Sequence, residues 1–283
     1  MAKGVLGIII CPMVDDNLIY SLKKDPEAKR IVILDDESNG SLRRKLDKAG
    51  IAYETATWGE LRSHEVRFDR GEFNILVRTI NLGLHSEPEK LKSTVEDLTR
   101  RMQPYVDGMA FYLGMCGNYD WDIARWCSEE GLKPGAMFCD SCGNLCHDCV
   151  GINIAGGPKY AEMQKKYVAH LFIFPAMATN FDDFMNADQA QTAATEESLT
   201  DEMREVLHIE PGRDGYLRWL LGLGGYQNLL KIDTGLEDPE VFDRDIRRVA
   251  ERTRLNIREA DEGWADLQPT EDLYAKAKSF LAQ

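Results

Sequence analysis

Short runs of consecutive apolar residues constrain the fold of this 283-residue chain more than any other feature of its sequence. A strand buried on both faces is apolar throughout, whereas a strand with one wet face alternates apolar and polar residues. Helical periodicity fills the stretches between the runs, and this alternation is typical of a doubly wound, mostly parallel sheet in the α/β class. The runs that predict strands of this one sheet lie at residues 5–10, 31–34, 73–77, 109–113 and 168–174, with a short further strand at 136–138.

Beyond residue 180 the pattern becomes mainly helical. Apolar residues at helical spacing predict helices at 181–188, 199–207, 216–221, 239–253 and 271–281, with short strands near 231–236 and 255–258. No repeat of fixed period and no low-complexity linker interrupts the chain. We therefore expect a single α/β domain over residues 1–283, with the sheet core and a cysteine loop in 1–180 and a helical C-terminal elaboration in 181–283.

The formal net charge of −14 argues against a nucleic-acid partner, because such proteins need a basic footprint. No apolar run approaches the length of a membrane span, and the start Met-Ala-Lys-Gly lacks the pattern of a signal peptide. We therefore expect a cytoplasmic protein without membrane contact. A homo-oligomer is expected as well, since most soluble proteins that assemble do so as symmetric homo-oligomers.

Four of the seven cysteines lie within eleven residues, and a histidine lies among them. Thiolates are preferred ligands of zinc and of iron–sulfur clusters, and thiol pairs also carry out redox chemistry. A disulfide framework is not expected in the cytoplasm, and the loop is too polar for cysteines that only fill a core. We expect a zinc ion or an iron–sulfur cluster here, with a redox dithiol as the alternative. The predicted ligands in this loop are Cys139, Cys142, Cys146 and Cys149, and the histidine is His147.

The spacing C-x2-C-x3-C-x2-C is too compressed for the two knuckles of a zinc ribbon. Its last three cysteines have the spacing of the cluster loop of radical-SAM enzymes, but Asp148 stands where those enzymes usually have an aromatic residue. A compact loop of this spacing is able to wrap a cluster, with a further ligand supplied from elsewhere in the chain.

Other thiols and a histidine follow the predicted strands directly. Cys11 follows the first strand, His85 the third and Cys116 the fourth, and the cysteine loop follows the short strand at 136–138. The carboxyl ends of parallel strands meet at one edge of the sheet, where ligands bind. We therefore expect Cys11 and Cys116 to complete the metal site, and His85, Gly117 and His147 to help bind the cofactor. Gly117 would allow close approach of the backbone.

Other motifs carry less information. Gly156-Gly157-Pro158 lacks the spacing of a dinucleotide-binding or phosphate-binding loop, so it predicts a turn. Cys127 lies on the apolar face of a predicted helix and is interpreted as a packing residue. No arrangement of serine, histidine and aspartate stands out, and the sequence therefore identifies no catalytic residue.

Several short motifs together resemble a known family, the domain-of-unknown-function family numbered 1638. The resemblance implies a cysteine after the first strand, a Cys-Gly after a central strand and a cysteine before an apolar helix, matching Cys11, Cys116 and Cys149. Members are often encoded beside corrinoid-dependent methyltransferases in anaerobes. This implies a role in methyl transfer or corrinoid activation, with a corrinoid protein or a methyltransferase as partner and the corrinoid on that partner. The motifs are Leu84-His85-x2-Pro88-Glu89-Lys90-Leu91, Tyr112-Leu-Gly-Met-Cys116-Gly117-Asn118, His147-Asp148-Cys149 with Gly156-Gly157, and Tyr226 leading to Ile232-Asp233-Thr234-Gly235-Leu236.

Three functional interpretations follow. The first is a thiolate-ligated metal or [4Fe–4S] protein of corrinoid-linked one-carbon metabolism, acting in methyl transfer or in electron transfer to a partner. The second is a thiol–disulfide oxidoreductase that uses Cys139-x2-Cys142 or Cys146-x2-Cys149, with one thiol of depressed pKa. The third is a non-catalytic scaffold with a structural zinc.

Overall fold

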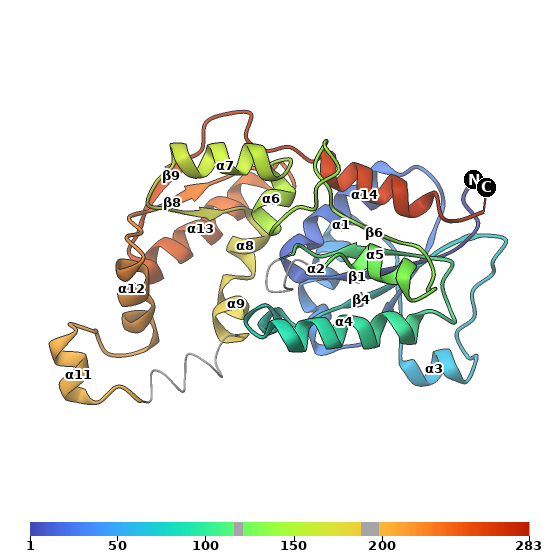
Figure 1. Cartoon of the computed structure of the whole chain (residues 1–283), viewed down its shortest axis with the longest axis horizontal. Coiled ribbons are helices and arrows are strands. Elements are labelled where there is room, and N and C mark those ends of the chain that lie inside the picture. Colours follow the sequence, from blue (N-terminus) through green and yellow to red (C-terminus); the bar gives the residue numbers. More distant parts are fainter. Residues whose placement is uncertain (116–120, 188–197, 283) are drawn as a thin grey trace. The chain divides into compact units, whose positions relative to one another are not determined.

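The chain forms two compact units (Figure 1). The first consists of Met1–Gly157 together with Asp266–Gln283, and the second of Pro158–Ala265. The computed structural model describes residues 1–115, 121–187 and 198–282. The sequence predicted one domain, with its sheet core ending near residue 180. The second unit begins earlier, at Pro158, because β7 (His170–Ile173) pairs with strands of that unit, and the last helix of the chain returns to the first unit.

A six-stranded sheet forms the centre of the first unit, with the order β3-β2-β4-β1-β5-β6. Every neighbouring pair is parallel, which confirms the predicted doubly wound architecture. All seven residues of β1 are buried, as its continuous apolar sequence predicts. The strands are β1 (Gly4–Ile10), β2 (Arg30–Leu34), β3 (Glu54–Ala56), β4 (Phe73–Thr79), β5 (Gly108–Tyr112) and β6 (Gly135–Met137).

Helices cover both faces of this sheet. Alternate residues of β1 enter opposite apolar clusters, with Leu6 and Ile8 in one and Val5 and Ile9 in the other. The first cluster is completed by α1 (Asp15–Lys24), α2 (Gly40–Ala49), α6 (Cys149–Asn153) and α14 (Gln268–Lys278). The second is completed by α3 (Trp58–Arg62), α4 (Pro88–Met102) and α5 (Ile123–Glu129). The helix after β1 therefore covers one face, whereas the helices after its neighbours β4 and β5 cover the other.

The second unit has a parallel sheet of its own, in the order β7-β8-β9. Its core joins Ile173 and Leu229 of the sheet to Phe242 and Ile246 of the long helix α13. The strands are β7 (His170–Ile173), β8 (Asn228–Lys231) and β9 (Asn256–Glu259). The helices are α7 (Gly157–Lys166), α8 (Pro175–Thr179), α9 (Phe181–Ala187), α11 (Asp201–Val206), α12 (Arg213–Leu223) and α13 (Pro239–Thr253).

The helical character of the C-terminal region is confirmed, but one assignment of a strand to a sheet was wrong. The strand predicted at 168–174 forms as β7, yet it pairs with β8 in the second sheet and not with the first four strands. An apolar run indicates that a strand is buried, but it carries no information about which partner buries it. The turn predicted at Gly156-Gly157-Pro158 coincides with the start of α7.

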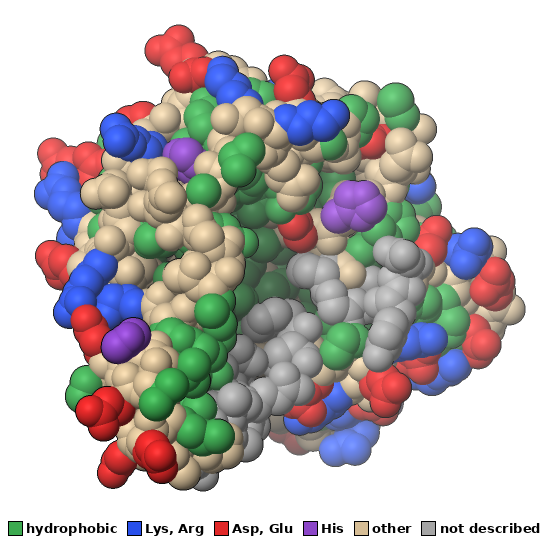
Figure 2. All heavy atoms as spheres, turned by 60° about the vertical axis from the view of Figure 1, so that its left-hand side comes forward, with side chains coloured by type: hydrophobic (Ala, Val, Ile, Leu, Met, Phe, Trp, Pro, Cys, Tyr) green, Lys and Arg blue, Asp and Glu red, His purple; other side chains and the backbone are tan. Residues whose placement is uncertain are grey.

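Acidic and basic side chains are interspersed over the face shown in Figure 2, where no broad basic patch is present. Within the described ranges, none of the helices is both long and apolar enough to cross a membrane.

Candidate functional site

The strand order brings the predicted site loops together. The four strands that precede these loops, β4, β1, β5 and β6, are consecutive in the sheet. Their carboxyl ends lead to the 3-10 helix η3 (Leu82–Ser86), which contains His85, then to Cys11, to the segment after β5, and to the cysteine loop. Cys116 and Gly117 of the segment after β5 lie outside the described residues. The loops thus share one edge of the sheet, the usual location of ligands in such folds.

Backbone hydrogen bonds connect these loops directly. The amide of Cys11 donates to the carbonyl of Tyr112 at 3.1 Å, which places Cys11 beside the end of β5. The amide of Met115 donates to the carbonyl of Cys146 at 3.3 Å. The residue immediately before Cys116 therefore lies against the backbone of the cysteine loop.

The cysteine loop is a short hairpin organised by one buried carboxylate. Cys139 pairs with Leu145 in an antiparallel bridge, and Asp140 lies at the turn. The Asp140 carboxylate is 5% exposed and accepts the amides of Cys142 and Asn144, each at 2.9 Å. Burial alone would raise the pKa of Asp140, but these hydrogen bonds, with that of the Asn144 side chain, hold it below its ordinary value. Asp140 is therefore an anion that shapes the loop, a role that the sequence analysis did not assign to it.

Gly156 lies against the turn of this hairpin. Its φ of +89° favours glycine, and a Cβ at this position would lie 2.4 Å from the Cβ of Asp140. The two residues are sixteen positions apart in the sequence. Close approach of the backbone, and not only the turn itself, thus requires glycine here.

The hairpin separates its own cysteines. Residues directly opposite in an antiparallel pair point to the same side, and successive residues alternate. Cys139 therefore shares a side with Leu145, which packs in the α4–α5 layer, whereas Cys146 lies on the other side with Phe138. Cys142 is exposed at the tip.

Three of the predicted ligands contact the same apolar layer. Cys146, 1% exposed, belongs to the cluster of α1, α2, α6 and α14. Cys149 and Cys11 are half-buried and pack against that cluster, and Cys11 also packs against the opposite one. Cys127 is buried on α5 in the opposite layer, as a packing residue would be. In the described part of the chain, however, no three histidine, cysteine, aspartate or glutamate side chains stand where they could share a metal ion.

Cys149 occupies the first position of the short helix α6. Asp148 caps this helix by accepting the amide of Gly151 at 2.7 Å. His147, which precedes the cap, is exposed, and its Nε2 lies near Gly157, 4.0 Å from where a Cβ would be.

A buried polar junction anchors α6 to the two neighbouring helices. The side-chain amide of Asn17 on α1 donates to Asn153 on α6 at 3.0 Å and to Thr270 on α14 at 2.9 Å. All three residues are at most 1% exposed. Since α1 follows the Cys11 loop and α6 begins at Cys149, the junction fixes the two cysteine-bearing segments relative to each other.

A second buried polar cluster lies at the start of α1. Lys45 on α2 extends its Nζ between Asp15 and Asp16, 2.5 Å from an oxygen of each carboxylate. Burial by itself lowers the pKa of Lys45, but the two carboxylates outweigh it and raise the pKa above its ordinary value. Ser41 also donates to Asp15, at 2.6 Å. This charge cluster holds the first turn of α1, four residues after Cys11.

Burial keeps the described core thiols neutral. Burial, together with nearby Cys139, Asp140 and Asp148, raises the pKa of Cys146 to about 12, and burial likewise raises that of Cys127 to about 12. The pKa of Cys139 is also raised, chiefly by burial. A neutral thiol must release its proton before it binds a metal ion, so metal binding at Cys146 is coupled to proton release.

We expect the metal-free, reduced protein to lose stability as the pH rises above about 9, the ordinary value for a thiol. A folded-state pKa above the unfolded value means that the unfolded state releases its proton first. Each such thiol then lowers the free energy of unfolding by about 1.4 kcal/mol per pH unit, up to the folded pKa near 12. Urea unfolding from about pH 8 to about pH 10.5 measures the slope.

The Cys146→Ala variant provides the comparison, because every other titrating group is retained. Its slope should be shallower than that of the wild type by the contribution of one thiol. Equal slopes would contradict a buried neutral thiol at this position.

The motif at 232–236 lies in the second unit, at the carboxyl end of β8. There Asp233 accepts the amide of Gly235 at 2.8 Å, and Gly235 has a φ of +67°. The motif lines a cavity of about 480 Å³ within that unit. It is therefore a turn beside a strand end, in a sheet separate from that of the cysteine loop.

A family model described as "Protein of unknown function (DUF1638)" matches residues 79–270, which is more than half of the chain. The matched range contains the whole cysteine loop and begins after Cys11. No curated protein and no solved structure matches the chain.

Proposed function

The chain belongs to the DUF1638 family, and from this premise we propose that it is a thiolate-ligated metal or [4Fe–4S] protein. In this proposal it serves corrinoid-linked one-carbon metabolism, as a component of methyl transfer or of corrinoid activation. One observation carries the proposal: β1, β5 and β6 are consecutive in the sheet. The three thiol-bearing loops that follow these strands therefore start at the same edge of the sheet.

The donor set fits a metal that prefers sulfur. Cys11, Cys146 and Cys149 contact one apolar layer. Cys116 directly follows Met115, whose amide donates a hydrogen bond to the carbonyl of Cys146. Thiolates select zinc and iron–sulfur clusters over hard cations. The described side chains of Cys11, Cys146 and Cys149 do not stand around one metal position, so these four cysteines would hold the group only after the loops at the strand ends shift. Cys139, on the other side of the hairpin, would need a further change in the loop.

A bound zinc would supply Lewis-acid activation of a thiol, and a bound cluster would supply electron transfer. The chain's own contribution is a nearly dry layer around Cys146 and a fixed geometry. Asp140 holds the hairpin, and the junction of Asn17, Asn153 and Thr270 holds the helix of Cys149. Such supporting contacts normally set both the affinity and the properties of a metal site.

The proposed partner is a corrinoid protein or a methyltransferase, with the corrinoid on the partner. The acidic net charge of −14 supports a protein partner over a nucleic acid. The proposal includes action in the cytoplasm as a homo-oligomer without membrane contact.

Anaerobic purification followed by iron, zinc and sulfide analysis tests the proposal. We expect stoichiometric metal in the wild type and at least about tenfold weaker metal binding in Cys149→Ser and Cys146→Ser, because each loses a thiolate ligand. Cys127→Ala is the matched control, since it removes a buried thiol from the opposite layer and should keep the metal.

Other results would support the alternatives. Metal loss in Cys142→Ser but not in Cys149→Ser would move the site to the tip of the hairpin. A metal-free protein with one reducible disulfide would contradict the proposal and support the oxidoreductase. The structural scaffold would be supported if zinc is needed for folding but no methyl transfer occurs when a corrinoid partner is added. The raised pKa values of Cys139 and Cys146 count against the oxidoreductase, because reactive thiols have depressed ones.

A further inference from the structure

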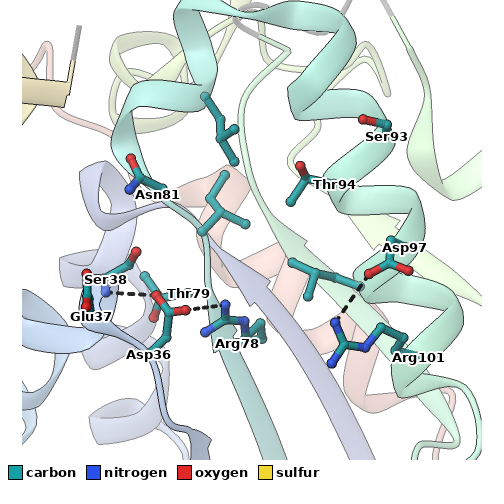
Figure 3. A pocket seen from close by; sticks show the side chains of 13 residues that line it. Asp36, Glu37, Ser38, Arg78, Thr79, Asn81, Ser93, Thr94, Asp97 and Arg101 are labelled. Atoms are coloured by element: carbon teal, nitrogen blue, oxygen red, sulfur yellow. Dashed lines mark hydrogen bonds and ion pairs between the residues drawn. The ribbon is translucent and has the colours of Figure 1, made fainter. Parts of the chain in front are cut away.

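A polar cavity of about 690 Å³ lies at the carboxyl ends of β2 and β4, and none of the described cysteines lines it. Figure 3 shows its two walls: Asp36, Ser38 and Asn81 on one side, and Ser93 and Thr94 of α4 on the other. The volume is that of a small-molecule site. Leu84 belongs to one of the family motifs, but the sequence predicts no binding role for the polar lining residues, because hydroxyls and single arginines are too common to form a motif.

The topology of the sheet explains why a cavity forms here. β2 and β4 are neighbours, but α2, which follows β2, packs in one layer and α4, which follows β4, packs in the other. The two connections leave the sheet in opposite directions and open a crevice between them. In open parallel sheets such a point of divergence is where ligands bind.

Arg78 lies at the base of the cavity with spare hydrogen-bonding capacity. Its side chain is 15% exposed, and its Nη2 donates to Asp36 at 2.5 Å. Its Nε and Nη1 are buried and find no acceptor among the described residues, and the same holds for the hydroxyl of the neighbouring Thr79. Buried polar donors are normally satisfied, so these groups indicate an acceptor supplied from outside the described residues, which a bound ligand would provide.

A second guanidinium extends from α4 toward β4 (Figure 3). The guanidinium carbon of Arg101 lies over the ring of Trp58, 4.1 Å from its centroid, and this contact holds the guanidinium in place from one face. Its contact with Asp97, at 3.4 Å, is an exposed pair within one helix and is weak. Arg101 is therefore able to exchange this partner for a ligand anion.

Asp36 supplies the complementary acceptor. Burial alone would raise its pKa, but hydrogen bonds from Arg78 and from the amide of Ser38 hold the pKa below its ordinary value. An ionised carboxylate at the end of the second strand is the group with which doubly wound folds bind ribose hydroxyls. The loop after β1, by contrast, is filled by buried Pro12, Met13 and Val14 and offers no glycine-rich cradle for a pyrophosphate.

We propose that this cavity binds a ribose that carries a single phosphate, either a sugar phosphate or a mononucleotide. Arg78 and Arg101 bind the phosphate, because planar guanidinium groups match the geometry of its oxygens. Asp36 and the wall hydroxyls of Ser38, Ser93 and Thr94 form hydrogen bonds with the ribose hydroxyls. The site occupies different strand ends from the cysteines, and its test does not depend on metal.

Titration calorimetry on the full chain, in metal-free and metal-bound forms, tests the proposal with ribose 5-phosphate, AMP, ribose and inorganic phosphate. Saturable binding is expected for ribose 5-phosphate or AMP, tighter than for ribose or phosphate alone. The tighter of the two phosphorylated probes identifies a sugar phosphate or a nucleotide as the ligand. Arg101→Gln should weaken this binding by about tenfold, the effect of one charge-assisted contact.

Arg100→Gln is a closely matched control. Arg100 is on the same helix, lies over Trp126 and pairs with Glu130, but it does not line the cavity. Unchanged affinity in this variant supports the proposal, and equal weakening in both variants overturns it. The proposal also fails if neither phosphorylated probe binds, or if phosphate alone binds as tightly as ribose 5-phosphate.

Discussion

Replacing Lys45 with methionine should lower the free energy of unfolding by about 3–5 kcal/mol, the typical cost of leaving buried charges without their partner. Asp15 and Asp16 are 0% and 6% exposed, and Lys45 is the cation within 2.5 Å of both. Methionine keeps most of the volume of the lysine stem, so the loss reports the charge and not a cavity. Urea denaturation at neutral pH measures the effect.

Arg44→Met is the matched control, because it removes a cation from the same helix at an exposed position. Its effect should stay within about 0.5 kcal/mol. Equal stability of the two variants would show that the carboxylates at the start of α1 do not need a counter-charge. The Lys45 variant should also loosen the first turn of α1, which faster amide exchange in residues 15–18 would report.

Replacing Gly156 with alanine should destabilise the first unit by about 2–4 kcal/mol. A positive φ costs an alanine about 1–2 kcal/mol, and the clash with Asp140 adds to this cost. The new Cβ would lie 2.4 Å from the Asp140 Cβ and 3.4 Å from its Cα, so the hairpin itself must shift. Metal binding should fall along with stability, because the shift moves the segment between Cys139 and Cys146.

Gly143→Ala separates the cost of the positive φ from the cost of the steric clash. Gly143 has a similar φ of +83° in the same loop, but a Cβ there meets nothing within 4 Å. This variant should show only the backbone cost. If both variants lose the same stability, close contact between Gly156 and Asp140 is not what requires glycine.

The extent to which the sequence predicted the fold depended on burial. β1 is apolar in every residue but its glycines and was predicted almost to its ends, because burial on both faces leaves a continuous signal. β3 was missed, since Glu54 and Thr55 are exposed and only Ala56 is buried. The run at 168–174 was recognised as a strand, but its sheet was not, because pairing is a long-range property.

The candidate site was likewise predictable where local sequence decides and unpredictable where long-range pairing decides. The positions of Cys11, Cys116 and the cysteine loop after strands that became β1, β5 and β6 could be predicted, because strand ends follow from local pattern. The order of those strands could not. Likewise, the side of the hairpin on which Cys139 and Cys146 lie depends on register, and the role of Asp140 depends on amides that it meets only in the folded loop.

The bridge between Ile154 and Asp266 gives the second unit the character of an insertion. The chain leaves the first unit after Gly157 and returns beside Ile154, where the amide of Asp266 donates to Asn153 at 2.8 Å. Leu273 and Tyr274 of α14 then enter the core of the first unit. During synthesis on the ribosome, the β-sheet of this unit emerges long before the helix that completes its core. The layer around Cys146 therefore closes only after residues 273–281 have emerged and packed.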